Sequence, residues 1–223
     1  MRVLFATAEF APVARVGGLA EATSGLVAAL RRDGVEVQVV LPDYQGLELT
    51  GEIAVEVDVP VWLDHLRIRR GRHPEIGDLT LVDVPGIRRP HPYVDEQGRG
   101  WPDNDARFMG FSAGVAALCR RESPDVLHLN DWHTAATLGL LTERPPSVLT
   151  IHTLGYQGVM DRSWLDHMVA DAHRFAWYDA ANPLAGGVEL ADRVVAVSPN
   201  YAREILTPEA GMGLDGRLRA LGH

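Results

Sequence analysis

The sequence has 223 residues, of which 46% are hydrophobic and 23% charged. These proportions are typical of a globular protein, and the length allows one substantial hydrophobic core. With 21 basic and 30 acidic side chains the net charge is −9, which argues against nucleic acid and anionic membranes as partners, because both attract a basic surface.

Short apolar runs, each β-branched or leucine-rich, are spaced along the whole chain. The first run ends at Glu9 after about five apolar residues, which is shorter than the apolar part of a secretory signal. No run reaches 18 residues, so we expect no membrane-spanning segment. Continuous short runs are typical of strands buried on both faces of a parallel sheet. They predict strands at residues 3–8, 35–41, 79–84, 126–129, 148–151 and 194–197.

Helical patterns lie between these runs. From Leu19, apolar residues recur at helical spacing until Gly34. Residues 105–121 are alanine-rich with an apolar face and predict a second helix. We expect shorter helices at 134–141 and at 201–206, the latter with Ser198 as N-cap and Pro199 at its first position.

Two segments depart from this alternation. Residues 53–70 alternate apolar and polar side chains and predict two strands of a hairpin at the margin of the sheet. Residues 85–102 are rich in proline and glycine and predict a loop. The single cysteine, Cys119, has no partner within the chain for a disulfide, so we expect a reducing, cytoplasmic location.

Repeated strand–helix–strand units predict an α/β fold with a doubly wound, mainly parallel sheet and helices on both faces. We expect residues 1–223 to form a single Rossmann-like domain. Ligands of such sheets bind beyond the carboxyl ends of the strands, so the turns after the strands are the candidate functional segments.

The turn after the first strand is Arg15-Val16-Gly17-Gly18-Leu19, which leads into a helix. The two glycines allow a ligand to approach the backbone, and the helix N-terminus offers unpaired N–H groups. Arg15 adds a positive charge suited to phosphate. A Gly-Gly turn before a helix is structural at least as often, and Glu21 complements the helix dipole without any ligand.

Further motifs follow the later strands in a fixed order. They are His128-Leu129-Asn130-Asp131-Trp132-His133-Thr134, Thr150-Ile151-His152-Thr153-Leu154-Gly155-Tyr156-Gln157-Gly158, the stretch 191–205, Thr207-Pro208-Glu209 and Gly213-Leu214-Asp215-Gly216. In this order and at these spacings, the sequence resembles glycogen synthases and starch synthases over nearly its whole length. That family transfers glucose from a nucleotide sugar to an α-1,4-glucan.

The resemblance implies a GT-B architecture, in which two Rossmann-like domains face each other across a cleft. The N-terminal domain carries most of the acceptor surface, and the C-terminal domain binds most of the nucleotide and supplies the catalytic Arg, Lys and Glu. The chain ends about where family members cross to that second domain. We therefore expect the N-terminal half of a retaining α-glucosyltransferase, inactive without a C-terminal GT-B domain in cis.

The resemblance also assigns donor-side residues. Arg15 stands at the lysine of the family's Lys-x-Gly-Gly-Leu loop, which reaches the donor phosphates. Gly17 and Gly18 match the glycines of that loop. Asp131 matches the acidic residue of the Asp-Trp-His motif near the reacting sugars, and His152 matches the histidine that contacts the donor glucose. Both are expected to be catalytic.

The acceptor side is assigned in the same way. Tyr156 and Gln157 match the Tyr-Gln-Gly turn beside the cleft, and Asn104 and Arg107 fall in a block resembling a helix start close to the acceptor. This class of transferase works without a bound metal, so we expect no metal and no cofactor. ADP-glucose or UDP-glucose would be the donor substrate.

Structural alternatives exist for several of these residues. Asp131 could simply cap the helix that starts at Trp132, and His152 could be a hydrogen-bonded core histidine. Trp132, Trp164 and Trp177 are more readily explained by packing than by stacking on sugars.

The sequence also departs from the family pattern. Arg15 and Val16 replace lysine and threonine, Thr153 replaces asparagine, and Ala185 replaces a lysine. Residues 46–102 are also shorter than usual for the family. Two other functions therefore remain open: a standalone carbohydrate-binding or regulatory subunit, and a divergent transferase that acts on a small-molecule acceptor.

Overall fold

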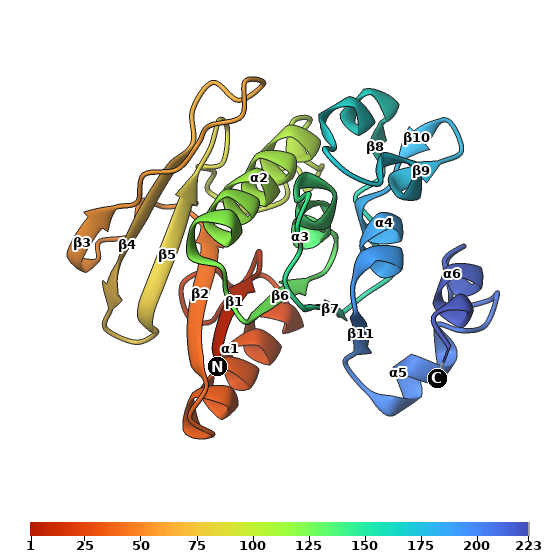
Figure 1. The fold of residues 1–223 in the computed structure, drawn as a ribbon, viewed down its shortest axis with the longest axis horizontal. Helices are drawn as coiled ribbons and strands as arrows, with labels where there is room; N and C mark the ends of the chain where they lie inside the picture. The colour runs from red at the N-terminus through yellow and green to blue at the C-terminus, as the bar shows by residue number, and fades with distance from the viewer. Residues whose placement is uncertain (223) are drawn as a thin grey trace.

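The sheet at the centre of the protein has eight strands, of which six run parallel (Figure 1). A computed structural model describes residues 1–222. The parallel strands are β1 (Arg2–Ala6), β2 (Glu36–Pro42), β5 (Gly77–Asp83), β6 (Val126–Asn130), β7 (Ser147–Ile151) and β11 (Arg193–Ala196). Each coincides with a predicted run, so the predicted doubly wound sheet is confirmed.

Two antiparallel strands extend one edge of this sheet. β3 (Thr50–Ala54) pairs with β4 (Arg67–His73), and β4 pairs with β5. The complete strand order is β11-β7-β6-β1-β2-β5-β4-β3.

The predicted hairpin is thus present at the sheet margin, but the alternating stretch itself is not a strand. Residues 55–66 connect β3 and β4 outside the strands, although the Val55 N–H still donates to the Ile68 carbonyl of β4 at 2.9 Å. Pro60 lacks an N–H for a ladder, and Val55 and Leu63 are buried in the same core cluster as α2. The apolar residues of this alternating pattern include those whose side chains point into the core from an irregular segment.

Helices cover both faces of the sheet. α1 (Gly18–Arg32) lies on one face, where Val27 packs with Val3, Val37 and Val39. The opposite face carries α2 (Asn104–Glu122), α3 (Trp132–Ala135), the 3-10 helix η1 (Ala136–Leu140) and α4 (Pro183–Leu190). The short α5 (Pro199–Glu204) and α6 (Asp215–Ala220) follow β11.

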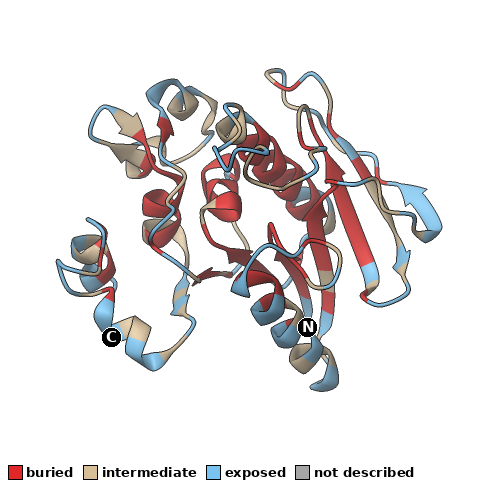
Figure 2. Ribbon diagram, turned by 180° about the vertical axis from the view of Figure 1, so that it is seen from behind, coloured by how far each residue is buried: buried red, intermediate tan, exposed pale blue. Residues whose placement is uncertain are grey.

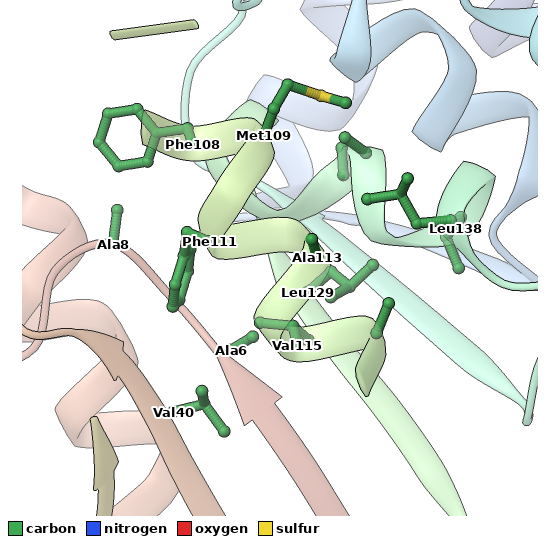
Figure 3. Close-up of a cluster of buried hydrophobic side chains, with 14 of the residues drawn as sticks. Ala6, Ala8, Val40, Phe108, Met109, Phe111, Ala113, Val115, Leu129 and Leu138 are labelled. Carbon is green, nitrogen blue, oxygen red and sulfur yellow. The ribbon is translucent and has the colours of Figure 1, made fainter. Parts of the chain in front are cut away.

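The helix α2 is the centre of the larger core. Every residue from 107 to 119 is buried, including Cys119. Phe111 and Val115 face Ala6, Val40 and Leu129 of the sheet, as Figure 3 shows. Figure 2 shows the same helix and the central strands as the most deeply buried part of the molecule.

A smaller unit between β7 and α4 was not predicted. It holds a three-stranded sheet of β8 (Met160–Asp161), β9 (Ala176–Trp177) and β10 (Ala180–Ala181), with the 3-10 helices η2 (Arg162–His167) and η3 (Ala172–Phe175). Residues 85–102 form a loop, as expected. Within residues 1–222, none of the helices has the length and apolar character needed to cross a membrane.

Candidate functional site

A pocket of about 860 Å³ lies beyond the carboxyl ends of β1, β6 and β7, where a doubly wound sheet binds ligands. One wall is the start of α1, and the opposite wall is the loop of residues 85–102. Six of the predicted site residues line it: Gly17, Gly18, Asn104, Asp131, His152 and Tyr156.

The turn before α1 presents its backbone to this pocket. The Val16 and Gly17 amides donate to Glu9 Oε2 at 2.9 and 2.8 Å, so these two N–H groups are already paired. Gly18 is the first residue of α1, and its N–H has no partner within the helix. A Cβ on Gly17 or Gly18 would meet no atom within 4 Å, so the space beside the turn is open to a ligand.

The Arg15 side chain does not line the pocket. It is largely exposed, and its Nε lies 2.9 Å from Glu21 Oε1, in the first turn of α1. The guanidinium is therefore held at the outer rim of the turn by an exposed ion pair, which water screens and which contributes little to stability.

Asp131 lines the pocket and has an unusual backbone conformation. Its φ is 54° and its ψ is −173°, a region that costs energy for a residue other than glycine. The side chain does not cap α3; its Oδ1 instead accepts from the backbone N–H of His152 at 2.7 Å. Burial raises the pKa of Asp131 to about 7. The backbone hydrogen bonds from His152 and Thr153 act in the opposite direction, because they favour the ionised form.

His152 follows β7 and is fixed by a hydrogen bond to Asn130. The distance from His152 Nε2 to Asn130 Oδ1 is 3.0 Å. Asn130 uses its own amide nitrogen on the Ala6 carbonyl, so Oδ1 is the acceptor and the imidazole carries its proton on Nε2. Burial lowers the pKa of His152 to about 4, which leaves a neutral ring whose Nδ1 can accept from a hydroxyl.

The predicted acceptor residues separate into two groups. Tyr156 is exposed, and Asn104 and Tyr156 also line a neighbouring cavity of about 380 Å³ together with Gln157. The Gln157 amide is engaged within the protein, because it donates to Met212 O and accepts from Asn182 Nδ2.

Arg107 lines neither cavity, because it is completely buried beneath them. It donates to the carbonyl oxygens of Ile87 and Pro92 and to Asn104 Oδ1, at 3.2, 3.0 and 2.6 Å. The guanidinium thus holds the loop of residues 85–102 in place.

Glu9, Tyr93 and His133 also line the pocket and were not among the predicted site residues. Glu9 is a charge just after the first strand, a signal that could have been read. Tyr93 belongs to the loop of residues 85–102, and the position of a loop side chain cannot be predicted from sequence. Its hydroxyl donates to Glu9 Oε1 at 2.8 Å, and its ring stacks on His133 at 5.0 Å.

Among residues 1–222, no group of three or more His, Cys, Asp or Glu side chains is arranged to hold a metal ion. The polar groups of the pocket are instead a free helix N-terminus, a neutral imidazole and a buried carboxyl. They suit a ligand with both an anionic group and hydroxyls.

The fold and this pocket define a Rossmann-like α/β domain whose ligand crevice lies beyond the carboxyl ends of the parallel strands. Residues 2–220 match the family described as starch synthase catalytic domain. The chain therefore belongs to that family of glycosyltransferases, and it corresponds to the N-terminal half of a GT-B protein.

Curated relatives agree with this assignment. Glycogen synthase 2 of Nitrosococcus oceani is 39% identical over 240 residues, covering 98% of this chain and 48% of that protein. Glycogen synthase of Paramagnetospirillum magneticum is 37% identical, with 98% and 49% covered. The chain thus spans about half the length of these relatives.

A solved structure has the same fold. The catalytic domain of starch synthase IV from Arabidopsis thaliana, bound to ADP and acarbose, matches with a TM-score of 0.80 at 28% identity. The match covers 99% of this chain and 49% of that one.

Proposed function

We propose that this chain is the acceptor-side domain of a retaining α-glucosyltransferase that moves glucose from ADP-glucose or UDP-glucose to an α-1,4-glucan. The observation that carries the proposal is the pairing, in one pocket, of an open helix N-terminus at Gly18 with the fixed imidazole of His152. The related starch synthase, which was bound to ADP and acarbose, supports a nucleotide and a glucan as ligands.

In this proposal the residues of this chain act by positioning and by electrostatics. The Gly18 N–H faces the departing phosphate. His152 Nδ1 accepts from a sugar hydroxyl, and Asp131 holds the His152 backbone through its carboxyl oxygen. A C-terminal domain in cis binds most of the nucleotide, so the isolated chain is inactive.

The test starts with the protein as the source cells contain it. A species of roughly twice this chain's mass should transfer glucose from ADP-glucose or UDP-glucose to maltoheptaose. In that species, His152→Ala should lower turnover more than tenfold, and Arg162→Ala, at an exposed position outside both cavities, serves as control. Glucan binding without transfer, by a species of this chain's own mass, would replace the proposal with a binding subunit.

A further inference from the structure

The carboxylate of Glu9 joins two walls of the pocket that are far apart in sequence. Its Oε2 accepts from the Val16 and Gly17 amides at the start of α1, and its Oε1 accepts from the Tyr93 hydroxyl of the loop at 2.8 Å. Glu9 is only 5% exposed. Because an unsatisfied buried carboxylate is costly, the loss of either set of donors changes the environment of the other.

The loop presents Tyr93 to Glu9 through several contacts. The Tyr93 ring stacks on His133 at 5.0 Å and lies 6.0 Å from Phe108, while the Tyr93 carbonyl accepts from Asn104 Nδ2 at 2.9 Å. Burial raises the pKa of Tyr93, so the hydroxyl keeps its proton and remains a donor. The position of the hydroxyl therefore follows the position of the loop.

The start of α1 depends on Glu9 in a different way. Gly17 is the N-cap of α1 but has no side chain with which to cap it. The Glu9 carboxylate orders the preceding turn by binding two consecutive N–H groups, and the Gly18 N–H follows immediately in the chain. A shift of this carboxylate moves the backbone that would face a donor phosphate.

We propose that Glu9 is a positioning residue that couples the loop of residues 85–102 to the turn before α1. Seating of the loop on the acceptor side then sets the geometry of the amides on the donor side. The meaning of these two sides rests on the proposed function, whereas the coupling itself is a property of this chain.

The coupling is measured by amide hydrogen exchange, followed by NMR, on the full 223-residue chain. Tyr93→Phe keeps the stacked ring and removes only the hydroxyl. It should speed exchange at the Val16 and Gly17 amides about fivefold or more, relative to amides of the central strand β2. Tyr178→Phe, at an exposed position, is the matched control and should change neither amide.

Variants of Glu9 complete a double-mutant cycle. Glu9→Ala should speed exchange at both amides further, and adding Tyr93→Phe to it should have no additional effect. Glu9→Gln should recover most of the protection, because its carbonyl oxygen accepts from the same amides and its NH2 can donate to Tyr93 Oη. A merely structural loss would not be rescued selectively at these two amides.

Unchanged exchange at Val16 and Gly17 in Tyr93→Phe, or additive effects in the double variant, would overturn the coupling. If Glu9→Ala fails to fold, Tyr93→Phe and Glu9→Gln still test the coupling, since both preserve the shape of the site. Intact coupling together with no glucose transfer by the native protein would count against the proposed function alone. In an active protein, Tyr93→Phe should raise KM for the nucleotide sugar about threefold.

Discussion

Asp131 combines a strained backbone with a buried carboxyl whose protonation is balanced near neutral pH. Burial raises its pKa in the folded protein to about 7, whereas an exposed aspartate titrates near 3.8. The folded state therefore binds this proton more tightly than the unfolded state. The resulting contribution to stability is fully present below pH 4 and is lost as the pH rises through 7.

Asp131→Asn removes this titration while its Oδ1 can still accept from the His152 amide. The variant should be more stable than the native chain at pH 8, by on the order of 2 kcal/mol, with a smaller difference at pH 5. Urea unfolding at the two pH values measures this. Equal differences at both would show that the Asp131 carboxyl does not titrate near neutrality.

At this scale, part of the site could be predicted and part could not. Gly17, Asp131 and His152 each follow a strand, so their meeting at one edge follows from the parallel sheet alone. Arg107 was assigned to the acceptor side, but its side chain is buried under the loop. The direction of a long side chain depends on what packs above it, and a loop leaves no periodic signal in the sequence.

The turn between β7 and the small sheet is fixed by one close contact between the backbone of Gly158 and the ring of Trp132. Gly158 has a φ of +71°, and a Cβ there would lie 2.1 Å from Cε3 of Trp132. Trp132 in turn lines both cavities. The backbone of the turn is pressed directly against the indole, which only a glycine allows.

Gly98 provides a matched control for this contact. It has a similar φ of +76°, but a Cβ there would meet nothing within 4 Å. Gly98→Ala should cost about 1 kcal/mol from backbone strain alone, whereas Gly158→Ala should cost at least about 2 kcal/mol more. Chemical denaturation with tryptophan fluorescence gives both values. Equal losses would mean that Trp132 moves aside freely.

The elements that sequence predicted correctly share a strong signal. The parallel strands are continuous apolar runs, and α1 and α2 carry long apolar faces. Strands of two residues, such as β8 and β10, are too short to show a period, so the small sheet was missed. In the connection between β3 and β4, apolar and polar side chains alternate although the backbone forms no strand, so this pattern resembled that of a strand.

At the scale of the whole molecule, the buried His128 and His133 and the half-buried His152 contribute to the response to acid. Burial lowers the pKa of His128 and His152 to about 4 and that of His133 to about 3. The unfolded chain takes up these protons from about pH 6.5 downward, and the folded protein does not. The contribution of these histidines to stability is therefore full above pH 6.5 and falls as the pH drops toward 4, whereas the contribution of Asp131 changes in the opposite direction.

His133→Phe isolates one of these contributions. His133 lies among Tyr93, Phe108 and Trp132, and its buried Nδ1 has no hydrogen-bond partner among the described residues. The variant should lose about 2 kcal/mol less stability than the native chain between pH 7.5 and pH 5. His173→Phe, at an exposed position, is the control variant. An identical acid response in His133→Phe would show that His133 is not neutral in the fold.

Cys119 sits in α2, where burial raises the pKa of its thiol to about 11. A thiolate reacts with alkylating reagents, whereas a buried thiol held in this protonated form does not. Each labelling event therefore requires an opening that exposes Cys119 to solvent. The rate at which the single sulfhydryl of this 223-residue chain is modified therefore reports how often the core around α2 opens.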